Sequence, residues 1–166
     1  MAASPIRVVV VEDQKTTREG LTSLIAGTPG FVVAGGFDAV EGLITLLERP
    51  PRGAVDPDVV LLDIQLAGMT GLEGVRRLRA LRPGLLILML TVYDDNDRIF
   101  EAICGGACGY LLKDTPPERL IGALREAQGG GAPMSPEVAR KVVTMFQRAA
   151  PPRQAEHRLS PREMDV

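Results

Sequence analysis

The sequence predicts an α/β fold in which a parallel sheet of five strands is covered by helices on both faces. Short apolar runs alternate five times with longer amphipathic segments, the order expected of five βα units. The runs are apolar at consecutive positions, as in the four valines of residues 8–11, and such strands are typical of a sheet buried on both sides. We therefore expect a doubly wound sheet.

The same alternation gives approximate bounds for each element. The apolar runs are expected to form strands near 6–11, 31–35, 58–62, 85–90 and 108–112. The amphipathic segments are expected to form helices near 14–26, 39–49, 71–82, 94–105 and 117–128.

Local signals mark the starts and ends of these helices. Three helices begin with an Asp or Thr followed three residues later by Glu, the spacing of a capping box: Asp38 with Glu41, Thr70 with Glu73 and Thr115 with Glu118. Pro116 is expected in the first turn of its helix. Glycine or proline follows the expected ends, at Gly27, Pro50, Pro83 and Gly129.

The five βα units occupy a first domain, residues 1–130. Residues 131–158 read as a linker that contains a helix near 135–148. That helix begins at a Ser-Pro-Glu sequence. Its apolar positions form one stripe, made of Val138, Val142 and Met145.

Residues 159–166 read as the start of a further helix. Ser160, Pro161 and Glu163 form another helix start, yet too few residues follow to hold a helix without a partner. We therefore expect the natural chain to continue beyond Val166.

Composition limits the classes of function. The chain has 166 residues and a net charge of -2, from 19 basic and 21 acidic side chains. This length fits one compact core with a short appendage, and this charge gives no long-range attraction to nucleic acid or an anionic membrane. No apolar run is long enough to span a bilayer, and no leader-like segment is evident. We expect a cytoplasmic protein without membrane contact.

The cysteines and the single histidine are not expected to be functional. Cys104 and Cys108 have no nearby histidine and would make only half of a tetrahedral zinc site, so we interpret them as small apolar fillers. His157 lies in the Pro- and Arg-rich linker, where a solvated side chain is expected rather than a catalytic base.

Reactive side chains follow four of the five expected strands. Glu12 and Asp13 follow the first strand, Asp63 the third, Thr91 the fourth and Lys113 the fifth. Ligand sites of doubly wound sheets form outside the carboxyl ends of the strands, so these side chains should converge. Three converging carboxylates repel one another unless a hard cation neutralises them, and Mg²⁺ is the natural occupant.

Each of these residues also has an ordinary interpretation. Glu12 and Asp13 could cap the helix that follows them, and Thr91 could cap the helix that follows the fourth strand. Lys113 could be a solvated surface charge. It is their joint occurrence that favours a site. The remaining acids near strand ends are interpreted as turn and first-turn helix residues, namely Asp56, Asp58, Asp94, Asp95 and Asp97.

Four segments resemble the receiver domain of bacterial two-component response regulators. They are Val-Val-Glu-Asp (10–13), Leu-Leu-Asp-Ile-Gln-Leu-Ala-Gly-Met-Thr-Gly (61–71), Leu-Thr-Val-Tyr (90–93) and Gly-Tyr-Leu-Leu-Lys-Asp (109–114). The resemblance covers residues 6 to about 130. It implies the CheY-like (flavodoxin-like) fold with strand order 2-1-3-4-5.

The resemblance also implies roles for the site residues. Asp63 would receive a phosphoryl group from a sensor histidine kinase, and the metal would be held by Glu12, Asp13, Asp63 and the main-chain carbonyl of Gln65. Thr91 and Lys113 match the switch hydroxyl and the lysine that pairs with the phosphoryl group. Tyr110 matches the aromatic residue that turns inward on activation, although a half-buried tyrosine with a solvated hydroxyl is an equal alternative from sequence alone. Such a domain is a phosphoacceptor switch rather than an enzyme.

The tail from Leu159 resembles the opening of the helix-turn-helix domain of NarL/LuxR-type regulators. The match implies a transcription factor that binds DNA through a C-terminal domain missing here. Phosphorylation would change the face formed by the fourth helix, fifth strand and fifth helix. That face, or a helix elsewhere, would then form a homodimer or release the DNA-binding half, and we expect a homodimer on activation. Two positions depart from the common receiver pattern, where Ala67 and Asp114 stand in place of prolines.

Three other functions fit the sequence less well. A phosphatase with an aspartate nucleophile needs a carboxylate two residues later, where Gln65 stands. A nucleotide-binding domain needs a glycine-rich turn after the first strand, where Glu12 and Asp13 stand. An unphosphorylated receiver-like module would have lost one of the acidic, Thr or Lys positions, and none is lost.

Overall fold

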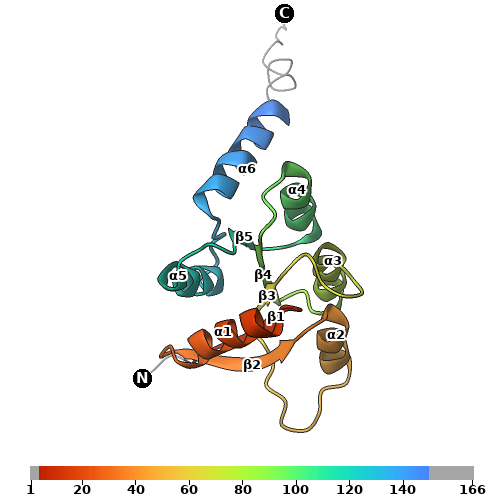
Figure 1. Cartoon of the computed structure of the whole chain (residues 1–166). Coiled ribbons are helices and arrows are strands. Elements are labelled where there is room, and N and C mark those ends of the chain that lie inside the picture. Colours follow the sequence, from red (N-terminus) through yellow and green to blue (C-terminus); the bar gives the residue numbers. More distant parts are fainter. Residues whose placement is uncertain (1–3, 150–166) are drawn as a thin grey trace, which may run out of the picture.

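The computed structural model describes residues 4–149 and shows a five-stranded parallel sheet in the order β2-β1-β3-β4-β5 (Figure 1). The strands are β1 (Ile6–Val11), β2 (Phe31–Phe37), β3 (Val59–Leu62), β4 (Leu86–Thr91) and β5 (Gly109–Leu112). The helices are α1 (Lys15–Ala26), α2 (Val40–Glu48), α3 (Gly71–Leu81), α4 (Asn96–Gly105), α5 (Pro117–Gln128) and α6 (Pro136–Ala149). The doubly wound fold and strand order expected from the sequence are confirmed.

The predicted linker beyond Ala149, with His157, and the predicted helix start at 159–166 lie outside the described residues. Among residues 4–149, no helix is both long and apolar enough to cross a membrane.

Helices cover both faces of the sheet because neighbouring strand residues point to opposite sides. Val8 and Val10 pack with α1 and α5, whereas Val9 and Val11 pack with α2, α3 and α4. All four valines are at most 1% exposed. The continuous apolar runs therefore reflect burial on both faces, as the sequence predicted.

One of the three expected capping boxes forms as a side-chain cap. The Thr70 hydroxyl accepts a hydrogen bond from the Glu73 amide (3.2 Å) at the start of α3. The prediction for Asp38 is wrong, because α2 begins one residue later and Ala39 is its N-cap. The prediction for Thr115 is wrong as well: Pro116 takes the N-cap position of α5, one place before the first turn expected for it, and the Thr115 hydroxyl donates to the Leu112 carbonyl (2.6 Å).

The acids near strand ends have local structural roles. Asp95 caps α4 by accepting from the Arg98 amide (3.2 Å), and Asp97 lies in its first turn. Asp58, just before β3, accepts hydrogen bonds from the Arg7 amide (2.9 Å) and guanidinium (2.8 and 3.1 Å). This pair ties the start of β3 to β1.

The cysteines behave differently from each other. Cys108 is partly buried against the core, as expected of an apolar filler, and burial raises the pKa of its thiol. Cys104 is exposed, so the filler interpretation is wrong for that residue.

The loop between β3 and α3 is folded tightly against the end of β3. The Gly71 amide donates to the Ile64 carbonyl (2.8 Å), and a Cβ at Gly71 would overlap the main-chain carbonyl oxygen of Asp63. Gly68 adopts a φ of 80°, and the Glu41 carboxylate of α2 accepts from the Met69 amide (3.0 Å). Glycines and a contact from α2 thus shape this loop, which has Ala67 in place of proline.

Replacement of Gly71 by alanine is expected to destabilise the domain by about 2–3 kcal/mol, because the new methyl group must displace backbone at Asp63. Urea unfolding measures the change. Gly20→Ala in α1 is the matched control. A Cβ there meets nothing within 4 Å, so that variant should gain about 0.5–1 kcal/mol from helix propensity. A neutral or stabilising Gly71→Ala would contradict the close approach.

Asp58→Asn is expected to lower the free energy of unfolding at neutral pH by about 1–2 kcal/mol, because charged hydrogen bonds with Arg7 are lost. The Arg7 guanidinium holds the pKa of Asp58 below its usual value. The stabilisation is therefore present above the unfolded pKa of about 3.9 and lost as pH falls through the lower folded value.

The difference between wild type and Asp58→Asn should accordingly shrink in unfolding experiments carried out below about pH 3. Asp56→Asn, which removes a more exposed ion pair with Arg82, should change stability by less than about 0.5 kcal/mol. A loss of equal size at neutral and acidic pH would rule out a role for the Asp58 charge.

Candidate functional site at the carboxyl edge of the sheet

The side chains that follow four strands meet at one edge of the sheet. The Lys113 ammonium, after β5, lies 2.5 Å from Glu12 Oε1 and 2.8 Å from Asp63 Oδ2. Thr91 ends β4 and is fully buried. The convergence expected from the sequence is therefore present in the structure.

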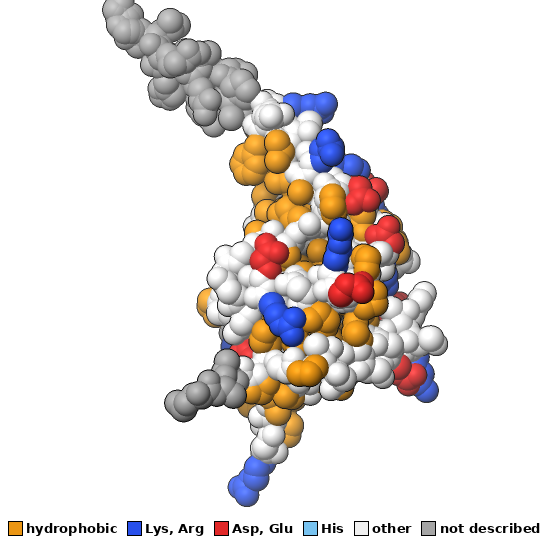
Figure 2. Space-filling model, turned by 90° about the vertical axis from the view of Figure 1, so that its left-hand side faces the viewer, with side chains coloured by type: hydrophobic (Ala, Val, Ile, Leu, Met, Phe, Trp, Pro, Cys, Tyr) orange, Lys and Arg blue, Asp and Glu red, His pale blue; other side chains and the backbone are white. Residues whose placement is uncertain are grey.

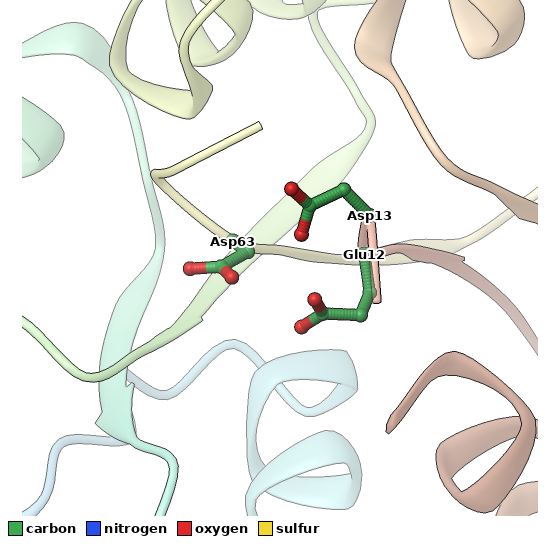
Figure 3. A group of neighbouring side chains, drawn as sticks. All are labelled: Glu12, Asp13 and Asp63. Atoms are coloured by element: carbon green, nitrogen blue, oxygen red, sulfur yellow. The ribbon is translucent and has the colours of Figure 1, made fainter. Parts of the chain in front are cut away.

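Three carboxylates form a compact cluster at this edge (Figure 3). Oxygen atoms of Glu12, Asp13 and Asp63 all lie within 4.8 Å of one another. Glu12 and Asp63 are buried, at 2% and 6% exposure, whereas Asp13 is exposed. The cluster is thus anchored in the sheet and open on the side of Asp13.

Charge at the cluster is only partly balanced. Burial raises the pKa of Glu12, and the ammonium of Lys113 opposes this rise. Burial disfavours the charged form of Lys113, but its hydrogen bonds with Asp63 and Glu12 outweigh burial and raise its pKa. One ammonium beside three carboxylates leaves an excess of oxygen ligands suited to a hard divalent cation. The acidic cluster is consistent with a receiver metal site.

Most of the ordinary interpretations of these residues are wrong. Lys113 is not a solvated charge, since its side chain is 22% exposed and paired with two carboxylates. Thr91 does not cap α4, because Asp95 does. Glu12 keeps part of the local role, since its second oxygen accepts from the Gln14 amide (3.0 Å) at the start of α1.

Tyr110 lies inside the domain rather than at its surface. It is fully buried, and its hydroxyl donates to the Tyr93 carbonyl (2.6 Å), so the alternative with a solvated hydroxyl is wrong. Burial raises the pKa of this phenol well above its usual value. The hydroxyl therefore stays protonated and remains a hydrogen-bond donor to the β4–α4 loop.

Tyr93 is a neighbour of the site that sequence reasoning missed. Its amide donates to the Thr91 hydroxyl (3.4 Å), and its own hydroxyl donates to the side chain of Gln65. The Arg98 guanidinium stacks 4.2 Å from the centre of its ring. Its place two residues after Thr91 was a signal in the sequence, but the contact with Gln65 depends on how two loops fold.

Comparison with known proteins places the chain in a family. The profile of the response regulator receiver domain matches residues 8–125. The transcriptional regulatory protein YxjL of Bacillus subtilis is 34% identical over all of this chain and 75% of its own length. NarL, the nitrate/nitrite response regulator of Escherichia coli, is 34% identical over 98% of this chain and 73% of its own length. DegU of Brevibacillus brevis is 33% identical over 86% of this chain and 58% of its own. The chain thus spans between 58 and 75% of the length of these three relatives.

Solved structures agree with this assignment. A two-component response regulator of the LuxR family from Aurantimonas sp. SI85-9A1 has a TM-score of 0.77 and 28% identity, over 86% of this chain and 99% of that one. The response regulator ChrA of a heme-sensing two-component system has a TM-score of 0.63 and 34% identity, over 97% of this chain and 72% of that one. The chain therefore belongs to the family of response regulator receiver domains and is related to the NarL and LuxR regulators.

Proposed function

We propose that this domain accepts a phosphoryl group on Asp63 from a sensor histidine kinase, with Mg²⁺, and thereby switches a DNA-binding output domain that controls transcription. The observation that carries the proposal is the position of the Lys113 ammonium, 2.8 Å from the Asp63 carboxylate within a cluster of three acids. A domain of this family is a phosphoacceptor rather than an enzyme with a separate substrate.

The transfer is an in-line displacement. A carboxylate oxygen of Asp63 attacks phosphorus, a P–O bond forms, and the P–N bond to the kinase histidine breaks as the imidazole leaves. The Ile64 amide donates to Asp63 Oδ1 (2.7 Å) while Lys113 contacts Oδ2, so both carboxylate oxygens are held in position before the reaction. This positioning lowers the entropic cost of the encounter.

Glu12, Asp13 and Asp63, with the main-chain carbonyl of Gln65, are the residues that would hold Mg²⁺. When bound, the cation neutralises charge on the phosphoryl oxygens and the carboxylates. Exposure of Asp13 leaves this side of the cluster open to the incoming phosphohistidine.

Thr91 and Tyr110 form the proposed switch. The Thr91 hydroxyl would bind a phosphoryl oxygen, and Lys113 would pair with another. Thr91 and Tyr110 contact the same residue, since Tyr93 donates to the Thr91 hydroxyl through its amide and accepts from Tyr110 through its carbonyl. A displacement of Thr91 would thus reach Tyr110 through the β4–α4 loop.

The proposed domain arrangement follows the relatives, whose names describe transcriptional and response regulators. Residues 1–130 would form the receiver, 131–158 the linker and 159–166 the start of the helix-turn-helix domain. The partners would be the kinase and DNA in the cytoplasm, with a homodimer formed on activation.

Asp63→Asn is expected to abolish labelling by a small phosphodonor such as acetyl phosphate in the presence of Mg²⁺, because the amide is not a nucleophile for phosphorus. Phosphate-affinity electrophoresis or mass spectrometry measures the product, which should be lost on treatment with hydroxylamine. Asp97→Asn, at an exposed acid in the first turn of α4, is the control and should label like wild type. Equal labelling of Asp63→Asn and wild type would disprove the assignment.

Asp13→Asn is expected to weaken Mg²⁺ binding by about tenfold or more, because one charged oxygen ligand is lost. Asp13 is exposed, so the variant should unfold at the same urea concentration as wild type. Isothermal titration with Mg²⁺ measures the affinity. Asp114→Asn removes an exposed acid next to Lys113 and should leave the affinity unchanged; equal effects of the two variants would indicate nonspecific attraction to negative charge.

A further inference from the structure

Helix α6 is fastened to the free edge of the sheet at its start. The Tyr110 amide donates to the Pro133 carbonyl (3.0 Å), and the Ser135 amide donates to the Tyr110 carbonyl (3.1 Å). The buried Ser135 hydroxyl accepts from the Leu112 amide (3.0 Å). Residues 133–135 thus pair with β5, as a strand would, and set the direction in which α6 leaves the sheet.

The apolar stripe of α6 then packs against α4 and the core. Val138 is fully buried, and Val142 and Met145 are partly buried against the same cluster, which confirms the stripe expected from the sequence. Helix α6 extends away from the sheet beyond α4 (Figure 1), and the space-filling view shows exposed apolar side chains toward its outer end (Figure 2). The large exposed apolar residues of α6 are Val143 and Phe146. The first turn of α6 is therefore held more firmly than its later turns.

A single basic side chain connects the middle of α6 with the β4–α4 loop. The Lys141 ammonium donates to the Asp94 carbonyl (2.6 Å) and lies 3.8 Å from the Asp94 carboxylate. Asp94 is three residues after Thr91, and Tyr93 between them is bonded to the Thr91 hydroxyl, to Tyr110 and to Gln65. A short path of contacts therefore runs from the phosphoacceptor site to α6.

We propose that the face formed by α4 and β5 has α6 of the same chain as its partner, and that phosphorylation of Asp63 releases residues 141–149 of α6 from that face. The inference rests on the proposed function, because it uses the phosphoryl group as the signal. The occupant is visible in the structure, because residues 133–135 already pair with β5 and the apolar stripe of α6 already packs beside α4.

The direction of the effect follows from the position of Thr91. Its hydroxyl bonds the Tyr93 amide at the long distance of 3.4 Å, which leaves it free to turn toward a phosphoryl oxygen. Because the Tyr93 amide is bonded to that hydroxyl and Asp94 follows Tyr93 in the chain, the proposed movement would shift residues 92–94 and with them the Asp94 carbonyl that Lys141 contacts. In the proposal, the Lys141 contact and the phosphorylated state would therefore oppose each other, whereas Ser135 and Val138 keep the first turn in place.

The coupling free energy between phosphorylation and the Lys141 contact is the same in both directions. If phosphorylation loosens α6, then loosening α6 must favour the phosphorylated arrangement of the loop. Lys141→Gln should therefore bind beryllofluoride, a mimic of the phosphoryl group, about threefold more tightly than wild type in the presence of Mg²⁺, as expected for loss of a partly exposed charged hydrogen bond. Arg140→Gln removes the same charge from the adjacent, exposed side chain and should leave the affinity unchanged.

The experiment uses the whole 166-residue chain. Hydrogen exchange with mass spectrometry is measured for wild type, Lys141→Gln and Arg140→Gln, across a titration with beryllofluoride. In wild type, beryllofluoride should slow exchange near Asp63 and Thr91 and speed exchange of residues 141–149. In Lys141→Gln, residues 141–149 should exchange faster even without the mimic, because the anchor is already lost.

The outcomes separate this inference from the proposed function. Protection around Asp63 with unchanged exchange of residues 141–149 would overturn the inference and leave the proposed function standing. Unchanged or weaker beryllofluoride affinity of Lys141→Gln, or an equal gain in Arg140→Gln, would overturn it as well. A wild-type chain that binds no beryllofluoride would overturn the proposed function, and the inference with it.

Discussion

The interaction on which the site depends is the placement of Lys113 between Glu12 and Asp63. Three carboxylates at one sheet edge repel one another, and the buried Glu12 would be costly without a partner. The Lys113 ammonium meets two of them at 2.5 and 2.8 Å, so the end of β5 is joined electrostatically to the ends of β1 and β3. A buried charge pair of this kind contributes less to stability than an apolar contact of equal size, but it becomes expensive to break on one side. The arrangement is therefore more readily explained by a functional site than by a contribution to folding stability.

Stability has to come from elsewhere, and the sheet supplies it. The strand residues behind the site are almost fully buried between two layers of helices. Their hydrophobic burial stabilises the fold and offsets the repulsion among the carboxylates at the acidic edge. Packing also fixes the position of Asp63. Its main chain lies close to Gly71, and the loop that follows it is bonded by the Glu41 carboxylate of α2. Asp63 is thus positioned by packing and by main-chain contacts of its loop.

Much of this could be predicted from the sequence because the determining signals are local. Consecutive apolar residues such as Val8–Val11 mark a two-sided sheet, and parallel strands bring their carboxyl ends to one edge, so Glu12, Asp63 and Lys113 had to approach each other. The helix caps were harder to predict from the sequence. A polar side chain near a helix start can bond either the helix amides or another group, and which bond forms depends on the folded structure. Glu41 reaches the loop before α3, and the Thr115 hydroxyl turns back to Leu112. Contacts between loops, such as Tyr93 with Gln65, have no local signature at all.

Helix α6 shows how a locally predictable element makes contacts that its own sequence does not predict. Its apolar stripe requires burial, yet the pattern of Val138, Val142 and Met145 does not say against which surface. The pairing of residues 133–135 with β5 decides this, because it fixes the starting point of α6 beside α4. Once α6 lies there, Lys141 reaches the carbonyl of Asp94, three residues from Thr91. The position of a helix placed in this way depends on the conformation of the β4–α4 loop, since each arrangement of the loop either keeps or removes the contact between Lys141 and Asp94.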